Sequence, residues 1–173
     1  MIKKLIINAD DFGLRDGVNK GIIEAHGNGV VSSVSIFVEG DAVENALNLL
    51  KENPKLGVGI HLNLDKFFNV DHQKGITTGF VHPKPSTEEL KTEIRRQIEK
   101  FLSCGLGCDH LDSHHHSHLN SEIFPLVCEF AKEFRIPFVR LPQRLFLNYA
   151  EFEGFKKILQ ENNLNHIEHF IEG

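Results

Sequence analysis

Carboxylates and imidazoles gather at three places in the sequence, each beside an apolar run. Asp10 and Asp11 end a short apolar run, and His61 lies inside a second one. A histidine tract over 114–118, interrupted by one serine, follows a third. Carboxylate and imidazole together suit zinc, iron, manganese and similar ions. An ion held by such a set with open positions lowers the pKa of a bound water and polarises a carbonyl, which is hydrolytic chemistry.

Each of these groups also has a purely structural explanation. An aspartate pair before Gly13 can cap a helix or form a turn. A single histidine such as His61 in an apolar strand is more often hydrogen-bonded in the core than bound to a metal. Within the tract, His114 and His118 would share a helix face, whereas His114 and His116 would share a strand face. Spacing alone therefore does not decide which imidazole binds an ion.

The aspartate pair can divide two roles between its members. If Asp11 is a metal ligand, Asp10 beside it is placed to act as general base. The sequence contains no G-x-S-x-G, P-loop or G-x-G-x-x-G motif. Acyl-serine, nucleotide and dinucleotide chemistry therefore lack support.

The elements that must position these residues are alternating strands and helices, which predict β-α-β units, a parallel sheet and an α/β fold of the (β/α) barrel type. The expected strands are 5–9, 30–38, 56–64, 110–114, 137–142 and 166–171. The expected helices are 17–28, 41–50, 86–102, 120–134 and 150–162, with caps at Asp41, at Ser86 or Thr87, and at Asn120 or Ser121. Residues 65–86 show no clear periodicity and are expected to form a long loop. Because polar residues follow several strand ends, we expect the site at the carboxyl edge of the sheet.

The composition excludes several classes of protein. Lys and Arg number 19 against 24 Asp and Glu, a net charge of −5, so no basic excess is available to bind nucleic acid. No apolar run approaches the ~20 residues that cross a bilayer, and the N-terminal segment becomes acidic too quickly for a signal peptide. Three cysteines, Cys104, Cys108 and Cys128, complete no zinc framework and are interpreted as reduced thiols. We therefore expect one cytoplasmic domain over 1–173 with no membrane contact.

Three motifs carry a resemblance to a known family. They are Asn8-Ala-Asp-Asp-Phe-Gly13, Gly59-Ile-His-Leu-Asn-Leu64 and His110-Leu-Asp-Ser-His-His-His-Ser-His118. In this order they resemble the YdjC (ChbG-like) carbohydrate deacetylase family. The resemblance implies a distorted, incomplete (β/α) barrel, TIM-barrel-like with fewer than eight strands. It also implies metal-dependent removal of acetyl groups from N-acetylated sugars of the chitooligosaccharide type.

The resemblance also assigns roles to residues. It implies one divalent ion, Mg²⁺, on Asp11, His61 and His114, with Zn²⁺ as the alternative that the donor set favours chemically. It makes Asp10 the general base and places Arg140 at a strand end near the pocket. We expect Arg140, His116 and His118 to contact substrate, with one histidine of the tract packing inside and another supporting a ligand.

The chain departs from the family pattern in two respects. Relatives continue past this point and carry a Cys-His-Pro-like segment, whose histidine is a candidate general acid, and this chain has none. We therefore expect a chain that lacks the family's C-terminal part, exposes a sheet edge and pairs as a homodimer. The segment 65–86 also differs from the family, which leaves the sugar open. Two alternatives remain: a weakly active metal- or sugar-binding domain, and a different metal-dependent hydrolase that cleaves lactams or phosphoesters.

Overall fold

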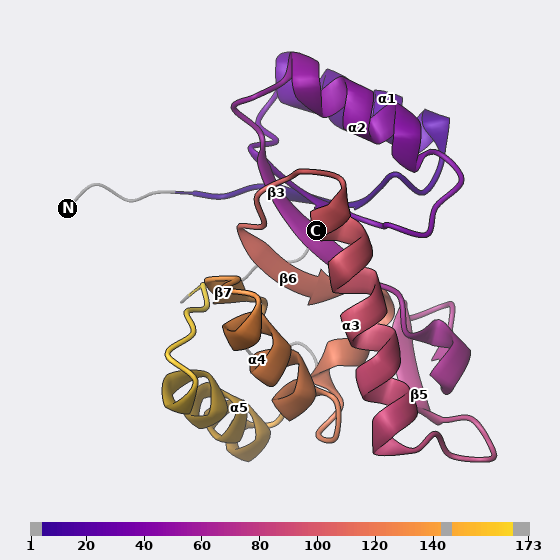
Figure 1. Cartoon of the computed structure of the whole chain (residues 1–173), viewed down its shortest axis with the longest axis vertical. Coiled ribbons are helices and arrows are strands. Elements are labelled where there is room, and N and C mark those ends of the chain that lie inside the picture. Colours follow the sequence, from indigo (N-terminus) through magenta and orange to yellow (C-terminus); the bar gives the residue numbers. More distant parts are fainter. Residues whose placement is uncertain (1–4, 143–146, 168–173) are drawn as a thin grey trace.

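The structure is a computed structural model that describes residues 5–142 and 147–167 (Figure 1). Five parallel strands form one sheet in the order β1-β2-β3-β6-β7. They are β1 (Asn8–Phe12), β2 (Ser33–Ile36), β3 (Gly57–Leu62), β6 (His110–Ser113) and β7 (Phe138–Val139). The spatial order of the strands follows their order in the chain, as in a (β/α) barrel. The predicted α/β fold with a parallel sheet is confirmed.

Helices connect the strands of this sheet. They are α1 (Asp16–Gly27), α2 (Val43–Glu52), α3 (Thr87–Ser103), α4 (Phe124–Glu133) and α5 (Tyr149–Glu161). Helices α1 and α2 lie side by side at the top of Figure 1, and α4 and α5 pack together at its lower left. Among the described residues, no helix combines the length and the apolar character needed to cross a bilayer.

The two faces of the sheet differ in chemistry because side chains alternate along each strand. On one face, Val34, Ile36 and Ile60 lie in register with apolar partners and are completely or almost completely buried in the core. On the other face, Ser35 pairs with a glycine of β3. The next row along that face joins His61 to a residue of β6. The polar face is therefore the one that can carry chemistry.

The first predicted strand is displaced. The apolar run predicts a strand over 5–9, but β1 begins at Asn8 and includes both aspartates. Leu5 and Ile6 precede it and remain 78% and 57% exposed. The pairing with β2 fixes the position of β1, since Asn8 lies opposite Ser33. Hydrophobicity alone does not reveal that register.

The expected loop over 65–86 contains regular structure, so that prediction is wrong. A 3-10 turn, η1 (Asp65–Phe67), leads into the antiparallel hairpin of β4 (Phe68–Asp71) and β5 (Ile76–Phe80). The stacked rings of Phe68 and Phe80, with centroids 4.6 Å apart, join the two strands. A cross-strand aromatic pair of this kind stabilises a hairpin.

The helix caps were predicted with mixed success. Ser86 caps α3 in a capping box with Glu89, as its sequence predicts. Asp41 does not cap α2, which has Ala42 at that position. The predicted start of α4 near 120 is also wrong, because a 3-10 segment, η2 (His114–Leu119), precedes a helix that begins at Phe124. Proline early in α4 is tolerated because its missing N–H has no helical partner in the first turn.

The sixth predicted strand, 166–171, lies mostly outside the described residues. Its described part, 166–167, has no strand pairing. Just before it, Asn165 forms an isolated parallel bridge with Phe138 of β7.

Candidate active site

A bulge in β1 brings two successive aspartates to one place. Asn8 and Ala9 pair with β2 in register, but Phe12 pairs only two residues further along β2, so β1 holds one extra residue. Asp11 adopts φ 63°, the left-handed conformation that such bulges use. In a regular strand, neighbouring side chains point to opposite faces. The bulge is why Asp10 and Asp11 both reach the carboxyl edge of the sheet.

Three predicted metal ligands converge on this edge from three strand ends. Asp11 Oδ1 lies 3.0 Å from His114 Nδ1 and 3.3 Å from His61 Nε2. One ligand atom from each residue lies within 4.8 Å of the others. His61 belongs to β3, and His114 follows β6 directly.

The donor atoms fit a bound cation. Asp11 Oδ1 is buried and makes no hydrogen bond, although two imidazole nitrogens lie beside it. His61 Nδ1 donates to Asp112 Oδ1 at 2.6 Å, which turns His61 Nε2 toward Asp11. A histidine that donates one ring nitrogen to a carboxylate and offers the other is the usual metal-binding arrangement. A cation bound between the two imidazoles would satisfy this buried carboxylate oxygen, which makes no hydrogen bond within the protein.

Asp112 connects the metal ligands to the rest of the site. It is completely buried. Its Oδ1 accepts from His61, and its Oδ2 accepts from Ser35 Oγ at 2.7 Å and is paired with the Arg140 guanidinium. Burial opposes ionisation, but Arg140 and His61 outweigh it and hold the pKa of Asp112 well below its usual range. Asp112 is therefore a buried carboxylate whose oxygens both have partners.

The same carboxylate affects the protonation of its histidine. Burial disfavours the charged imidazolium, but the adjacent Asp112 and the contacts with Asp11 raise the pKa of His61 to about 10. For Asp11, burial again opposes ionisation, and His114 and His61 lower its pKa below the ordinary value. Without an ion, a proton on His61 partly compensates the carboxylates, and a bound cation would replace that proton.

Asp10 lies beside this cluster and is held by two residues. Arg140 Nη1 and Nη2 donate to its two oxygens at 2.7 and 2.5 Å, a bidentate pair. Asn8 Nδ2 donates to Asp10 Oδ1 at 2.7 Å and to Ser35 Oγ at 2.8 Å. The side chain of Asp10 stays 37% exposed. Arg140, which we expected to contact substrate, here fixes Asp10 relative to Asp112.

The histidine tract does not form one regular face. His115 and His116 have φ values of 48° and 53°, which break the segment between His114 and Ser117. His116 is half-buried. The tract therefore forms neither the helix face shared by His114 and His118 nor the strand face shared by His114 and His116.

His118 lies in the interior, where its side chain is inaccessible to a substrate. Its Nε2 donates to the carbonyl of Arg140 at 3.0 Å, and its Nδ1 accepts from Ser113 Oγ at 2.6 Å. Burial, together with the nearby His116, lowers the pKa of His118 to about 3, so its ring is neutral. This placement differs from the expected substrate contact and corresponds to the histidine that packs inside.

Sequence reasoning gave no role to Asn8, Ser35 or Asp112. Asn8 and Asp112 lie within the quoted motifs, and Ser35 lies in a serine-containing strand. The hydrogen bonds that connect these residues depend on strand register, which cannot be read from the sequence. The structure also explains why the motif has glycine at position 59, since a Cβ there would lie 2.4 Å from the ring of His110.

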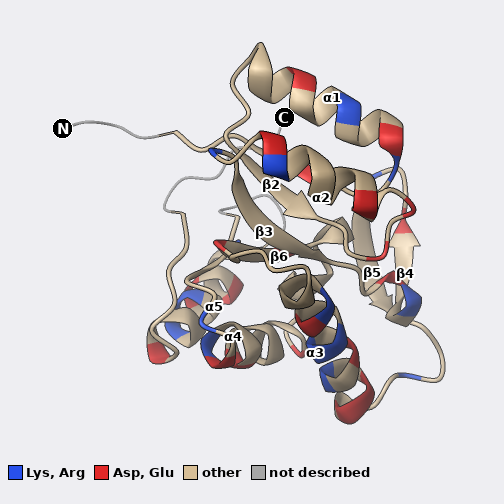
Figure 2. Ribbon diagram, turned by 45° about the horizontal axis from the view of Figure 1, so that its top comes forward, with Lys and Arg blue, Asp and Glu red and all other residues tan. Residues whose placement is uncertain are grey.

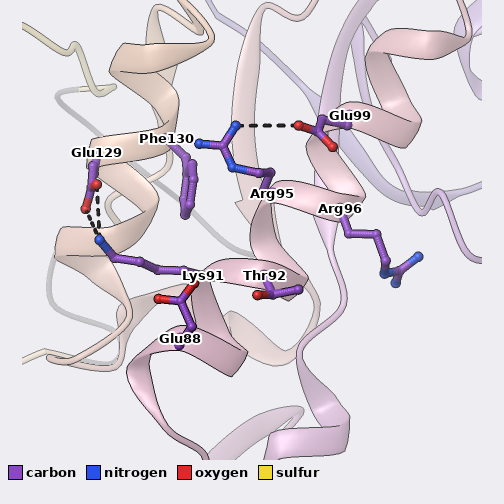
Figure 3. Close-up of a pocket in the computed structure, with 8 residues that line it drawn as sticks. All are labelled: Glu88, Lys91, Thr92, Arg95, Arg96, Glu99, Glu129 and Phe130. Carbon is purple, nitrogen blue, oxygen red and sulfur yellow. Dashed lines mark hydrogen bonds and ion pairs between the residues drawn. The ribbon is translucent and has the colours of Figure 1, made fainter.

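A groove between α3 and α4 lies apart from these residues (Figure 3). It has a volume of about 370 Å³. Its charged side chains pair with each other, with Lys91 bound to Glu129 at 3.0 Å and Arg95 to Glu99 at 3.5 Å. The first pair joins α3 to α4 and the second lies within α3. Both are surface contacts, so the carboxyl edge remains the candidate site.

Comparison with known proteins finds relatives along most of the chain. The family described as YdjC-like protein matches residues 4–172. A carbohydrate deacetylase of Brevibacillus brevis is 44% identical over 148 residues, which cover 80% of this chain and 59% of that protein. A chitooligosaccharide deacetylase of Proteus mirabilis is 38% identical over 149 residues, which cover 79% of this chain and 58% of that protein. The chain thus spans less than two thirds of the length of these relatives.

Solved structures show the same fold. A protein of Enterococcus faecalis, named a candidate cellobiose-phosphate cleavage protein, superposes with a TM-score of 0.75 at 29% identity and covers 94% of this chain and 66% of its own. The lactam utilization protein of Thermus thermophilus superposes with a TM-score of 0.65 at 17% identity, over 95% of this chain and 65% of its own, and shares the fold. From the match over residues 4–172 and the identity to these relatives, the chain belongs to the YdjC-like protein family.

Proposed function

We propose that this chain carries the site of a metal-dependent hydrolase that removes acetyl groups from N-acetylated sugars. The observation that carries the proposal is the convergence of Asp11, His61 and His114 beside a separate, arginine-held carboxylate, Asp10. The named activities of the relatives supply the substrate class, a carbohydrate with acetyl groups. Hydrolysis of an acetamide needs an activated water and a stabilised oxyanion.

Asp11, His61 and His114 would hold the ion. When bound, a divalent cation supplies Lewis acidity toward the acetamide carbonyl and makes water more acidic. The two imidazoles suit zinc, whereas the family resemblance favours magnesium. Asp112 would keep the Nε2 of His61 directed at the ion, since it accepts the hydrogen of Nδ1.

Asp10 would act as general base. Its carboxylate is oriented by Arg140 and Asn8 yet stays partly exposed, so a water can reach it. It would accept a proton from the attacking water. Arg140 would position Asp10 through its bidentate pair, and the half-buried His116 remains a candidate substrate contact.

We also propose that the protein acts in the cytoplasm as a homodimer. The described cysteines are free thiols, as in a reducing compartment. Strand β1 lies at the edge of the sheet, and the exposed Leu5 and Ile6 precede it. An open strand edge with apolar neighbours is a surface that a second copy can cover. Light scattering at micromolar concentration should give twice the chain mass, and a monomer would contradict the dimer.

The test of the function is acetate release from N-acetylated chitooligosaccharides. The full chain is stripped with a chelator and reloaded with Mg²⁺ or Zn²⁺, and a lactam and a phosphorylated disaccharide serve as competing substrates. We expect acetate release only after metal is restored. Cleavage of a competing substrate alone would replace the proposal with another hydrolase. If the chain binds metal but turns over none of these substrates, the proposal would be replaced by a metal-binding domain without hydrolase activity.

A further inference from the structure

A second set of metal-type donors lies next to the proposed catalytic cluster. We propose that Asp65, His114 and His115 form a second divalent-cation site of the zinc type, which shares His114 with the first. The set uses one carboxylate and two imidazoles, and one ligand atom from each lies within 4.8 Å of the others. It is distinct from the catalytic cluster because Asp65 and His115 belong to neither the ion site nor the base described above.

The topology explains why these three residues meet. Asp65 begins η1, three residues beyond the end of β3, and the two histidines begin η2 directly after β6. Strands β3 and β6 are parallel neighbours. Their carboxyl ends therefore face the same edge, and η1 and η2 are in contact there.

The side chains are close and accessible from solvent. His115 Nδ1 donates to Asp65 Oδ2 at 2.8 Å, and the rings of His114 and His115 have centroids 3.9 Å apart. The side chains are between 15% and 27% exposed, so an ion can enter without unfolding the segment.

An unsatisfied oxygen points to a ligand. Asp65 Oδ1 is buried and makes no hydrogen bond, while Oδ2 of the same carboxylate is occupied by His115. Buried carboxylate oxygens are rarely left without a partner. Asp65 therefore resembles Asp11, because each has one buried carboxylate oxygen that makes no hydrogen bond and could bind a cation.

The chemistry of the set favours zinc over magnesium, because two of its three donors are imidazole nitrogens. A neutral imidazole has one free lone pair, so His114 can serve only one of two ions at a time. Zinc on the second set would therefore withdraw His114 from Asp11 and His61. If the proposed function holds, excess zinc inhibits the enzyme; the binding itself does not depend on that function.

Zinc titration of the full chain with direct metal analysis tests the site. Because both sets need His114, we expect one zinc ion per wild-type chain, one each in Asp65→Asn and Asp11→Asn, which each keep one complete set, and none in the double variant. In the Asp11→Asn background, where only the second set is complete, His115→Gln should weaken zinc binding by more than about 10-fold, the loss seen even for supporting contacts. His72→Gln is the matched control, since its exposed ring lies 5.7 Å from that of His115 and is not in the set.

The outcomes separate this site from the catalytic proposal. Zinc bound with unchanged affinity by the folded double variant, or by Asp11→Asn that also carries His115→Gln, would overturn the assignment, as would a loss caused by His72→Gln alone. One ion in the wild type and none in Asp11→Asn would show that the second set does not bind. In an active magnesium-loaded protein, excess zinc should inhibit the wild type more than Asp65→Asn. Absence of deacetylase activity would contradict the proposed function and leave the zinc counts to decide the second site.

Discussion

Asp112 and Glu133 are both carboxylates paired with an arginine, but their surroundings are opposite. Asp112 is completely buried, and its partner Arg140 is only 10% exposed. Glu133 of α4 is 45% exposed and accepts from Arg95 of α3 at 2.7 Å. Figure 2 shows Lys and Arg interspersed with Asp and Glu on α3, which is typical of a solvated helix face.

Burial, rather than the presence of an arginine partner, determines how much each carboxylate contributes to the stability of this protein. An exposed ion pair stabilises a fold by about 0–1 kcal/mol because water competes for both charges. A buried pair costs several kcal/mol per ion in lost hydration, and removal of one partner leaves the other without compensation. The interior network therefore serves orientation, since it fixes Asp10, His61 and Arg140 in one arrangement.

Substitution of Asp10, the proposed general base, should reduce turnover more than any other change. Asp10→Asn keeps the shape and a partner for Arg140 but removes the proton acceptor. We expect turnover to fall about 10²–10⁴-fold, or about 3–5 kcal/mol of transition-state stabilisation. The measurement is acetate release with metal content determined in parallel, and the exposed Asp41→Asn is the control. Turnover near the wild-type rate would refute the role, and loss of metal would make Asp10 a ligand.

The second prediction concerns the buried carboxylate, Asp112. Asp112→Asn leaves Arg140 and His61 without their buried counter-charge, so we expect a loss of about 3–5 kcal/mol in the free energy of unfolding. Metal affinity should fall about 10–100-fold because His61 loses its supporting carboxylate. Urea unfolding and metal titration measure the two effects. A loss below about 1 kcal/mol would place Asp112 with the surface pairs.

The third prediction concerns His118, a buried imidazole, and the pH dependence of the free energy of unfolding. The pKa of His118 is lowered by burial from 6.5 to about 3, so below 6.5 the unfolded chain binds a proton that the folded chain does not. The free energy of unfolding should then fall with decreasing pH, by up to about 1.4 kcal/mol per pH unit from this group, and stay level above 6.5.

The matched variant for this series is His118→Gln. Its destabilisation relative to the wild type should shrink as the pH falls from 7.5 to 5, because it lacks the titrating ring. Urea unfolding of both proteins at each pH isolates this contribution from the carboxylates that they share. A constant difference across the range would show that folding does not change the pKa of His118.

The smallest effect belongs to the exposed pair. Glu133→Gln removes the partner of Arg95, which still contacts Glu99 at 3.5 Å and the ring of Phe130. We expect a change below about 1 kcal/mol in the free energy of unfolding, and less in high salt. A loss as large as that of Asp112→Asn would mean that exposure does not set the difference between the two carboxylates.

The fold was largely predictable because its signals are local. Alternating apolar runs and helical patterns gave the strand and helix order, and the capping box at Ser86 gave the start of α3. The start of β1 was not predictable, since pairing with β2 rather than hydrophobicity sets it. The sequence does not predict the β4–β5 hairpin because its strands are only four and five residues long and contain Asn, Asp and Gly, which are uncommon in strands.

The site was predictable in its residue types but not in its connections. The motifs named Asp10, Asp11, His61 and His114, which the structure brings to one edge. The left-handed backbone at Asp11 leaves no pattern in the sequence, yet it decides where both aspartates point. The contact of Arg140 with Asp10 spans 130 residues, and only the folded sheet reveals it.

The β4–β5 hairpin has a consequence for protein engineering. It forms a two-stranded sheet of its own, apart from the five-stranded sheet, and β5 contacts η2, the segment that carries the histidines. Where the segment leaves the hairpin, Val81 N–H donates to the carbonyl of Phe67 at 2.9 Å, which brings its ends together. Because it is a separate sheet with its ends joined, we expect that the hairpin can be lengthened at its turn without a change in the register of β3 and β6.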